Sequence, residues 1–291
     1  MKPADILIAL MVAIIWGLAF VASRIALDEL SPELMTAIRF TIAAVPCLFI
    51  RKPKVAWSLL IAISFTLFLG QFLSQAYGIA HGVPVGLTSV VVQSQALFTI
   101  GFAALAFGER PTPVQTLGIV IAAIGLLMIC GTVGYDFSVA AFAALMISPI
   151  SFAIGNILLR GARGVPMFDL FAWLCLAAAV PLLLLALIAN GPTPAWTSLA
   201  HMSLRSALCM LMLGGISTSI AYWLWGRLLR DYPAAQVVPF ALLVPFVGSA
   251  ASCVVFGERF GPLRLAGMLT VIGGIAVMVL AKRPQVLPKT A

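Results

Sequence analysis

The chain has 291 residues, of which 63% are hydrophobic and 9% charged, with a formal net charge of +8. Ordinary soluble domains have roughly 25% charged residues, so this composition excludes a soluble globular protein and indicates a membrane protein. The basic residues are not clustered on one soluble face, which argues against a nucleic-acid partner.

Ten apolar stretches follow one another along the chain, each near the length of about 20 residues that a helix needs to cross a bilayer. Lipid leaves only helices and closed barrels as spanning structures, and no alternating strand pattern appears. The expected fold is therefore an all-α membrane protein with ten transmembrane helices. Asp5 precedes the first apolar run, which we expect to stay in place rather than act as a cleaved signal. The predicted spans are residues 6–26, 32–50, 56–80, 84–107, 112–130, 138–159, 167–188, 206–229, 234–256 and 262–281.

One line of sequence occurs twice, as "FGERPTPVQTLG" at 107–118 and "FGERFGPLRLAG" at 256–267, an offset of 149 residues. Gly125 and Gly274 match at the same offset. The chain therefore divides into two related halves, 1–131 and 138–283, followed by a short tail, 284–291. Each half has five spans, and five is odd, so we expect the second half to enter the membrane from the opposite side, as an inverted-topology repeat.

Each copy of the repeated line is expected to form a turn between two helices. Phe107 and Phe256 close one helix, while Pro113 and Pro262 lie in the first turn of the next, where a missing N–H costs little. We interpret the acids of the two turns, Glu109 and Glu258, as helix-end residues that order the loop rather than as ligand contacts.

The basic residues predict the orientation of the chain in the membrane. If the amino terminus is cytoplasmic, twelve of them fall on the inner side and four, Arg24, Arg205, Arg259 and Arg264, on the outer side. An excess of Lys and Arg marks the cytoplasmic side, so we expect both termini in the cytoplasm. The twelve are Lys2, Arg51, Lys52, Lys54, Arg110, Arg160, Arg163, Arg227, Arg230, Lys282, Arg283 and Lys289.

Several short motifs carry a resemblance to a known family. With "WGLAF" at 16–20, "RF" at 39–40 and a "GER" turn after the fourth and ninth spans, the whole chain resembles the EamA branch of the drug/metabolite transporter superfamily. It is similar to bacterial exporters of amino acids, the YddG-like aromatic amino-acid exporters among them. The resemblance implies a bacterial inner-membrane carrier of amino acids and related metabolites. Phe152 departs from the pattern, since relatives often place Trp there.

The third span carries the strongest polar signal in the chain. Ser64, Gln71, Ser74, Gln75 and Gly78 fall on one face at helical spacing. Polar groups in hydrocarbon usually face a cavity or another helix. We expect this stripe to line a substrate cavity near the midplane, between the halves. The alternative is that it holds the bundle together through hydrogen bonds between helices.

The fourth span offers two further glutamines, Gln93 and Gln95, which in a regular helix point about 160° apart. Both cannot then line one narrow cavity, and the sequence does not choose between them. Their counterparts in the second half are Leu242 and Val244, so we expect the first half to supply most of the hydrogen bonding.

Aromatic and small polar side chains are expected to complete the cavity. Aromatic walls beside a few polar groups suit a partly apolar solute and attract an ammonium group. Tyr222 and Trp225 are equally consistent with a belt at the membrane surface. The candidates are Trp16 and Phe20 on the first span, Ser151 and Asn156 on the sixth, and Ser217, Thr218, Tyr222 and Trp225 on the eighth.

Arg39 is the one cation well inside an apolar span. It could receive a substrate carboxylate. The sequence favours a structural role, in which Arg39 bonds backbone carbonyls or a loop acid such as Asp28 or Glu33. Pro239 and Pro245 interrupt the ninth span and each frees a backbone carbonyl, which makes that span a candidate gate.

The missing residue types bear on the energy source. All nine acids lie at or near span ends, so no midplane carboxylate is present to exchange a proton, and no GxxxxGK[ST] loop is present for ATP. We therefore expect facilitated transport without cofactor or metal. The five cysteines lie in apolar spans without a metal-binding spacing, and we interpret them as small buried apolar residues. The alternative is a proton-coupled drug efflux carrier or a carrier of other small organic metabolites.

Three rival functions are less favoured. Both histidines lie in external links and no HExxH motif occurs, which argues against an intramembrane enzyme. Carriers of sugar phosphates should need several midplane cations, and only Arg39 qualifies. A structural scaffold would not need the polar stripe of the third span. Because the termini and loops are short, we expect a monomer whose partners are its substrate and membrane lipid.

Overall fold

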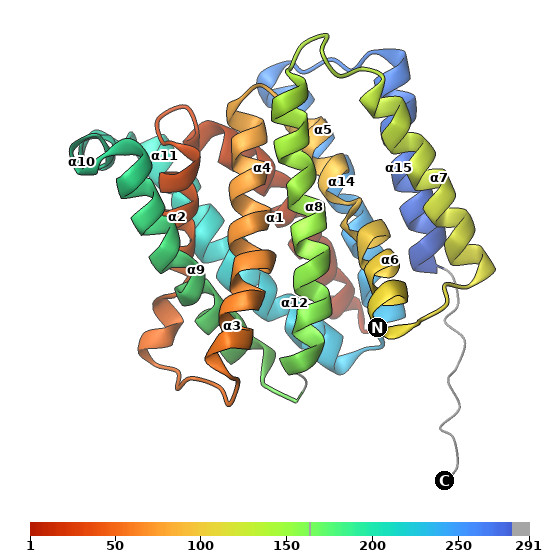
Figure 1. Ribbon diagram of the computed structural model, residues 1–291, viewed down its shortest axis with the longest axis horizontal. Helices are drawn as coiled ribbons and strands as arrows, with labels where there is room; N and C mark the ends of the chain where they lie inside the picture. The colour runs from red at the N-terminus through yellow and green to blue at the C-terminus, as the bar shows by residue number, and fades with distance from the viewer. Residues whose placement is uncertain (163, 281–291) are drawn as a thin grey trace.

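The computed structural model describes residues 1–162 and 164–280, and these residues form helices joined by turns, without a β-strand (Figure 1). The predicted tail, 284–291, lies outside them. Within the described ranges nine helical stretches are long and apolar enough to cross a membrane. The protein is an all-helical, multi-pass membrane protein. The nine stretches are Pro3–Ala26 (α1), Trp57–Ala80 (α3, η2 and α4), Val85–Phe107 (α5 and α6), Pro113–Cys130 (α7), Val139–Ala162 (α8 and η3), Met167–Asn190 (α9), Leu204–Asp231 (α11, η4 and α12), Val238–Phe256 (η5 and α14) and Pro262–Leu280 (α15).

The second predicted span is shorter than expected. The stretch 32–50 forms an α-helix of 12 residues, α2 (Pro32–Ala43), followed by a 3₁₀ turn, η1 (Val45–Leu48). Pro46 lies within that turn. A proline has no N–H to continue the helical bonding and its ring collides with the preceding turn, which accounts for the early end of α2. Two further short helices, α10 (Pro192–Ala200) and α13 (Ala234–Val237), lie between the long stretches.

Two spans contain π-helical segments near their middle. These are η2 (Phe65–Gly70), between α3 (Trp57–Ser64) and α4 (Gln71–Ala80), and η4 (Met212–Ile220), between α11 (Leu204–Leu211) and α12 (Ala221–Asp231). In η4 two hydroxyl groups donate to carbonyls five residues earlier: Thr218 Oγ1 to Leu213 O at 2.7 Å, and Ser219 Oγ to Gly214 O at 3.1 Å. Single π-helical turns inside α-helices occur frequently at functional sites.

The ninth span is interrupted at its two prolines, as the sequence predicted. Pro239 lies in a 3₁₀ segment, η5 (Val238–Leu242), and Pro245 is the third residue of α14 (Leu243–Phe256). The fourth span is also broken, although it has no proline near the break: Gln93 and Ser94 separate α5 (Val85–Val92) from α6 (Gln95–Phe107).

The break in the fourth span has a local cause. Ser94 Oγ donates to Val91 O at 2.7 Å, and the backbone N–H of Gln93 donates to Val90 O, three residues back instead of four. Serine hydroxyl groups compete with the helix for its own carbonyls in this way. The broken ends of the two spans also meet, since the Gln93 side-chain amide donates to Ala241 O at 3.2 Å. This is the carbonyl that Pro245 frees.

Both copies of the repeated line form the expected turn. Helix α6 ends at Phe107 and α14 at Phe256, and the next helices, α7 and α15, begin at Pro113 and Pro262. Each turn starts with a glycine in the left-handed region, Gly108 at φ 64° and Gly257 at φ 67°. Glycine adopts this conformation without the steric cost that a Cβ imposes.

Helices α7 and α15 pack side by side and antiparallel, as Figure 1 shows. A Cβ added to Gly118 would lie 2.7 Å from Gly274 O, and one added to Gly125 would lie 2.8 Å from Gly267 O. Four glycines thus allow the two backbones to touch. Close approach of this kind is how small residues associate helices in lipid.

The outer surface of the bundle carries large apolar side chains, as a lipid-facing surface should. Phe49, Leu105 and Leu127 are exposed there. Cys175 is buried, but Cys130 and Cys253 are exposed, so the expectation that all five cysteines are buried was wrong. Small apolar residues are tolerated on either side of a membrane helix because lipid tails are as apolar as a protein core.

Arg264, at the start of α15, ties down the loop that joins α7 to α8. Its two Nη atoms donate to the Asp136 carboxylate at 2.7 and 2.6 Å, and its Nε donates to Thr132 Oγ1 at 3.2 Å. The hydrogen-bonded guanidinium holds the pKa of Asp136 below its ordinary value.

Candidate substrate-binding cavity

A cavity of about 1060 Å³ lies inside the bundle, bounded by α1, α2, α4, α8, α9, α12 and α14. Ligand pockets in proteins are typically roughly 300 to 1,000 Å³, so the space is large enough for a small metabolite. Gly164, Pro166 and Arg230 line the cavity and are exposed. The cavity is therefore open at the end of the bundle where α8 and α12 finish.

Ten of the residues predicted to bind substrate line this one cavity. Three predicted serines do not line it, and each donates to a backbone carbonyl: Ser64 to Leu174 O, Ser151 to Thr66 O and Ser74 to Gly70 O, at 2.7, 2.8 and 2.6 Å. These serines join helices or stabilise their own. The ten are Trp16, Phe20, Arg39, Gln71, Gln75, Gln93, Gln95, Asn156, Tyr222 and Trp225.

Gln93 and Gln95 both line the cavity, so the expectation that only one of them could was wrong. That expectation assumed a regular helix with 100° between successive residues. The chain breaks between α5 and α6 at Gln93 and Ser94, which removes the fixed angle.

Three polar atoms on the cavity wall have no partner within the described ranges. Gln71 Oε1, Gln95 Oε1 and Ser217 Oγ are buried and make no hydrogen bond there. A buried polar group without a partner is costly, and in native proteins it usually bonds water or a ligand. Two of the three are amide oxygens, which accept hydrogen bonds. The wall can therefore receive an N–H or ammonium donor.

Arg39 lies on the same wall and is only 4% exposed. Its Nε donates to Thr218 Oγ1 at 3.0 Å, and its guanidinium carbon lies 4.2 Å from the centre of the Phe72 ring. Neither loop acid suggested as its partner is found there, and Asp28 pairs instead with Arg24. Among the described residues no carboxylate pairs with Arg39, so its Nη groups can receive an anion.

Aromatic rings form the wall around these polar groups. The Trp16 ring centre lies 5.3 Å from that of Tyr222 and 5.0 Å from that of Trp225, and Trp16 Nε1 donates to Ser217 O at 3.1 Å. Tyr222 and Trp225, which could have formed a belt at the membrane surface, therefore both contact Trp16 inside the bundle. Such rings can hold an apolar side chain or an ammonium group.

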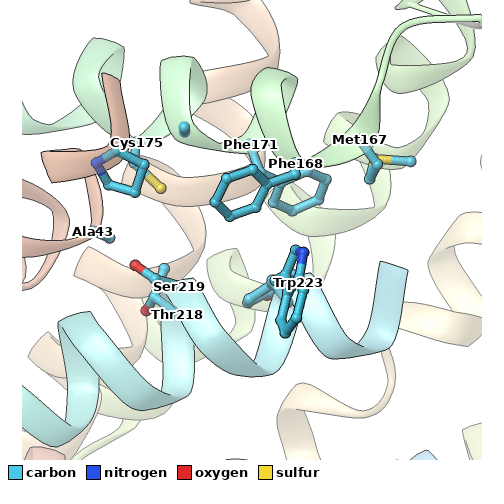
Figure 2. Close-up of a pocket in the computed structure, with 11 residues that line it drawn as sticks. Ala43, Met167, Phe168, Phe171, Cys175, Thr218, Ser219 and Trp223 are labelled. Carbon is cyan, nitrogen blue, oxygen red and sulfur yellow. The ribbon is translucent and has the colours of Figure 1, made fainter. Parts of the chain in front are cut away.

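A smaller recess of about 20 Å³ adjoins the cavity and shares part of its wall. In Figure 2, Phe168 and Phe171 of α9 lie on one side of it, with Trp223 and Thr218 on the other. Phe168 and Phe171 were not predicted as site residues. In an apolar span an aromatic residue that faces lipid has the same sequence pattern as one that faces a cavity, so no sequence signal separates the two.

Comparison with known proteins agrees with a transport cavity. The model of the EamA-like transporter family matches residues 4–131 and 139–280. A relative from Salmonella typhimurium, named "Probable amino-acid metabolite efflux pump", is 33% identical over 290 residues, with 97% of each chain covered. Its Escherichia coli counterpart, of the same name, is 31% identical with the same coverage.

Two further matches are weaker. A "Probable terminal-alkyne amino-acid exporter" from Streptantibioticus cattleyicolor is 25% identical, covering 96% of this chain and 94% of the other. A solved structure titled "Crystal structure of protein" has a TM-score of 0.65 at 18% identity, covering 95% of this chain and 96% of that one, and so shares the fold. The family matches both halves of the chain and its members are transporters rather than enzymes. This chain belongs to the EamA-like transporter family.

Proposed function

We propose that this protein exports amino acids and related small metabolites across the inner membrane of a bacterium by alternating access. The names of its relatives support the substrate class. The observation that carries the proposal is the chemistry of the cavity wall. Among the residues that the structure describes, the buried cation Arg39 has no counterion, and it shares the wall with the unpaired amide oxygens of Gln71 and Gln95.

This combination suits a zwitterion. The guanidinium of Arg39 binds the substrate carboxylate, since charge-assisted hydrogen bonds to arginine are strong and directional. The amide oxygens of Gln71 and Gln95 accept hydrogen bonds from the ammonium group, and the rings of Trp16 and Tyr222 add cation–π attraction. The apolar part of the substrate packs on the remaining aromatic wall.

The halves 1–131 and 138–283 are proposed to cross the membrane in opposite senses, five times each. The antiparallel packing of α7 on α15 supports this, because these helices hold equivalent places at the offset of 149 residues. The turns at Gly108 and Gly257 obey the same offset. The tenth crossing is α2 with η1, which together cover Pro32–Leu48. The unit is proposed to act as a monomer.

The cavity of this structure is proposed to face the cytoplasm. It opens where the loop from α8 to α9 and the end of α12 lie, and the basic residues Arg227 and Arg230 line it there. Positive charge favours the cytoplasmic side. Under the same assignment both termini are cytoplasmic. Segment η5, which contains Pro239, and the start of α14, which contains Pro245, border the cavity and are proposed to form part of the gate.

The first test is counterflow of radiolabelled amino acids in proteoliposomes. Gln71→Ala and Gln75→Ala are each expected to reduce the initial rate by about fivefold or more, since a hydrogen bond to a charged group contributes about 1.5–3 kcal/mol. The matched control is Gln115→Ala. Gln115 lies outside the cavity, in the capping box that starts α7, and this variant should exchange substrate at the wild-type rate. Equal rates in all four proteins would contradict the site assignment.

Transport is proposed to run without proton coupling. No Asp, Glu or His is among the residues that line the cavity in the described part of the chain, so the wall lacks the side chains that usually carry a proton in coupled transport. A pH difference imposed alone across the liposome membrane should therefore drive no accumulation. Accumulation against the gradient would favour the second candidate, proton-coupled efflux of larger apolar compounds, which the volume and aromatic wall of the cavity could also accept.

A further inference from the structure

The carboxylate of Glu258 accepts hydrogen bonds from two backbone N–H groups at the start of α5. We call this interaction the Glu258 clasp. Glu258 Oε1 accepts a hydrogen bond from the Val85 backbone N–H at 2.6 Å and its Oε2 from that of Gly86 at 2.9 Å. Both N–H groups belong to the first turn of α5, where backbone donors lack partners within the helix and the helix dipole favours a negative charge. Glu258 lies just beyond the end of α14, so it joins the fourth span to the ninth.

This clasp closes the end of the bundle opposite the cavity opening. A Cβ on Gly86 would lie 2.5 Å from Ser252 Oγ and 2.7 Å from Phe260 Cζ, so the helix ends touch. Ser249 Oγ also donates to Gly86 O at 3.2 Å. Figure 1 shows the start of α5 and the end of α8, which borders the opening, at opposite ends of the bundle.

The equivalent acid at the open end has a different partner. Glu109 lies 149 residues before Glu258, and its two oxygens accept from Arg160 Nη1 and Nη2 at 2.6 and 3.2 Å. At the same offset of 149 residues, Pro84-Val85-Gly86 correspond to Pro233-Ala234-Ala235. Those residues start the ninth span at α13 (Ala234–Val237). The acid that could clasp the ninth span is therefore held by an arginine at the end where the cavity is open.

We propose that Glu258 and Glu109 are alternating latches of the transport cycle. In the state seen here Glu258 holds the start of the fourth span and closes one end, while Glu109 is held by Arg160 and the other end is open. In the opposite state Glu109 binds the N–H groups of Ala234 and Ala235, and Glu258 releases those of Val85 and Gly86. This inference rests on the proposed function, since it requires alternating access between inverted halves.

A carboxylate is chemically suited to this task. Two neighbouring N–H groups need two acceptor oxygens, which Glu provides, whereas Gln presents one oxygen and one NH₂ that would oppose the second N–H. Each clasp forms in one state and not in the other. An interaction of this kind shifts the equilibrium between states by its full strength.

The test measures how readily the closed end opens. In a variant without the five native cysteines, Ser252→Cys places a thiol on a side chain that is fully buried beside the Glu258 clasp. The purified protein in detergent is treated with a charged maleimide, and labelling rates are compared for Glu258→Gln, Glu109→Gln and the unaltered latches. Glu33→Gln is the matched control, because Glu33 lies at the same end in the first turn of α2.

Glu258→Gln is expected to raise the labelling rate by about tenfold or more, since it removes a charge-assisted interaction. Glu258→Asp, which keeps the charge but reaches less far, should give an intermediate rate. Glu109→Gln should leave the rate at or below that of the unaltered latches, because it removes the clasp of the opposite state and, from the present state, only a solvent-exposed pair with Arg160. Glu33→Gln should leave the rate unchanged. Equal rates for Glu258→Gln and Glu33→Gln would overturn the proposal, as would an equal rise in Glu258→Gln and Glu109→Gln.

The labelling measurement needs no substrate, so the latch proposal and the proposed transport function are tested independently. If labelling follows the expected pattern but wild-type proteoliposomes exchange no radiolabelled leucine or phenylalanine, the latch stands and the proposed substrate class falls. If exchange occurs but labelling is the same in every variant, the proposed function stands and the latch falls.

Discussion

Replacing Arg39 with Gln is expected to lower the counterflow rate of amino acids by about 10- to 100-fold. Arg39 is buried on the cavity wall, pairs with no carboxylate among the described residues, and presents its Nη groups for an anion. A hydrogen bond to a charged group contributes about 1.5–3 kcal/mol, which corresponds to this range in affinity. Arg39→Lys keeps the charge but loses the two-pronged geometry, so it should retain part of the activity.

The substrate itself distinguishes binding from structural support. Amino-acid amides lack the carboxylate, so they should be exchanged equally by the Arg39→Gln variant and the wild type if Arg39 acts through that group. Arg51→Gln, which removes an exposed arginine in the link after η1, should leave all rates unchanged. A loss that is the same for the acids and their amides would show that Arg39 supports the fold through Thr218 and Phe72 instead.

Two neighbouring glycines of α15 are expected to differ sharply in their tolerance of alanine. A Cβ on Gly274 would lie 2.4 Å from Ala122 N and 2.6 Å from Gly118 O, whereas a Cβ on Gly273 would meet nothing within 4 Å. Backbone atoms cannot retreat without moving the whole of α7. Overpacking typically costs about 1–3 kcal/mol, so Gly274→Ala should lower the melting temperature in detergent by about 5 °C or more.

Gly273→Ala is the matched control, with the same added methyl group on the same helix. It should keep the wild-type melting temperature or raise it slightly, because alanine favours the helix over glycine. A melting-temperature loss of the same size in both variants would contradict the close packing of α7 on α15.

The sequence alone predicted the features that depend on local chemistry. The length of apolar runs, together with the requirement that lipid imposes on backbone hydrogen bonds, predicted nine of the spans. The repeated line predicted the ends at Phe107 and Phe256 and the starts at Pro113 and Pro262. The helical period placed Gln71 and Gln75 on the face that lines the cavity. In each case a residue and its near neighbours in sequence suffice.

The tertiary structure decided what depends on partners far away in the chain. The break in the fourth span is local, but only the packing of that span against the ninth brings Gln93 within reach of Ala241 O and places Gln93 and Gln95 at one cavity, against the helical period. Ser64 and Ser151, both candidate substrate-binding residues by sequence, instead bond carbonyls of other helices. The physical reason is that a polar group in hydrocarbon is satisfied equally well by a substrate, a neighbouring helix or its own backbone, and only packing determines which is within reach.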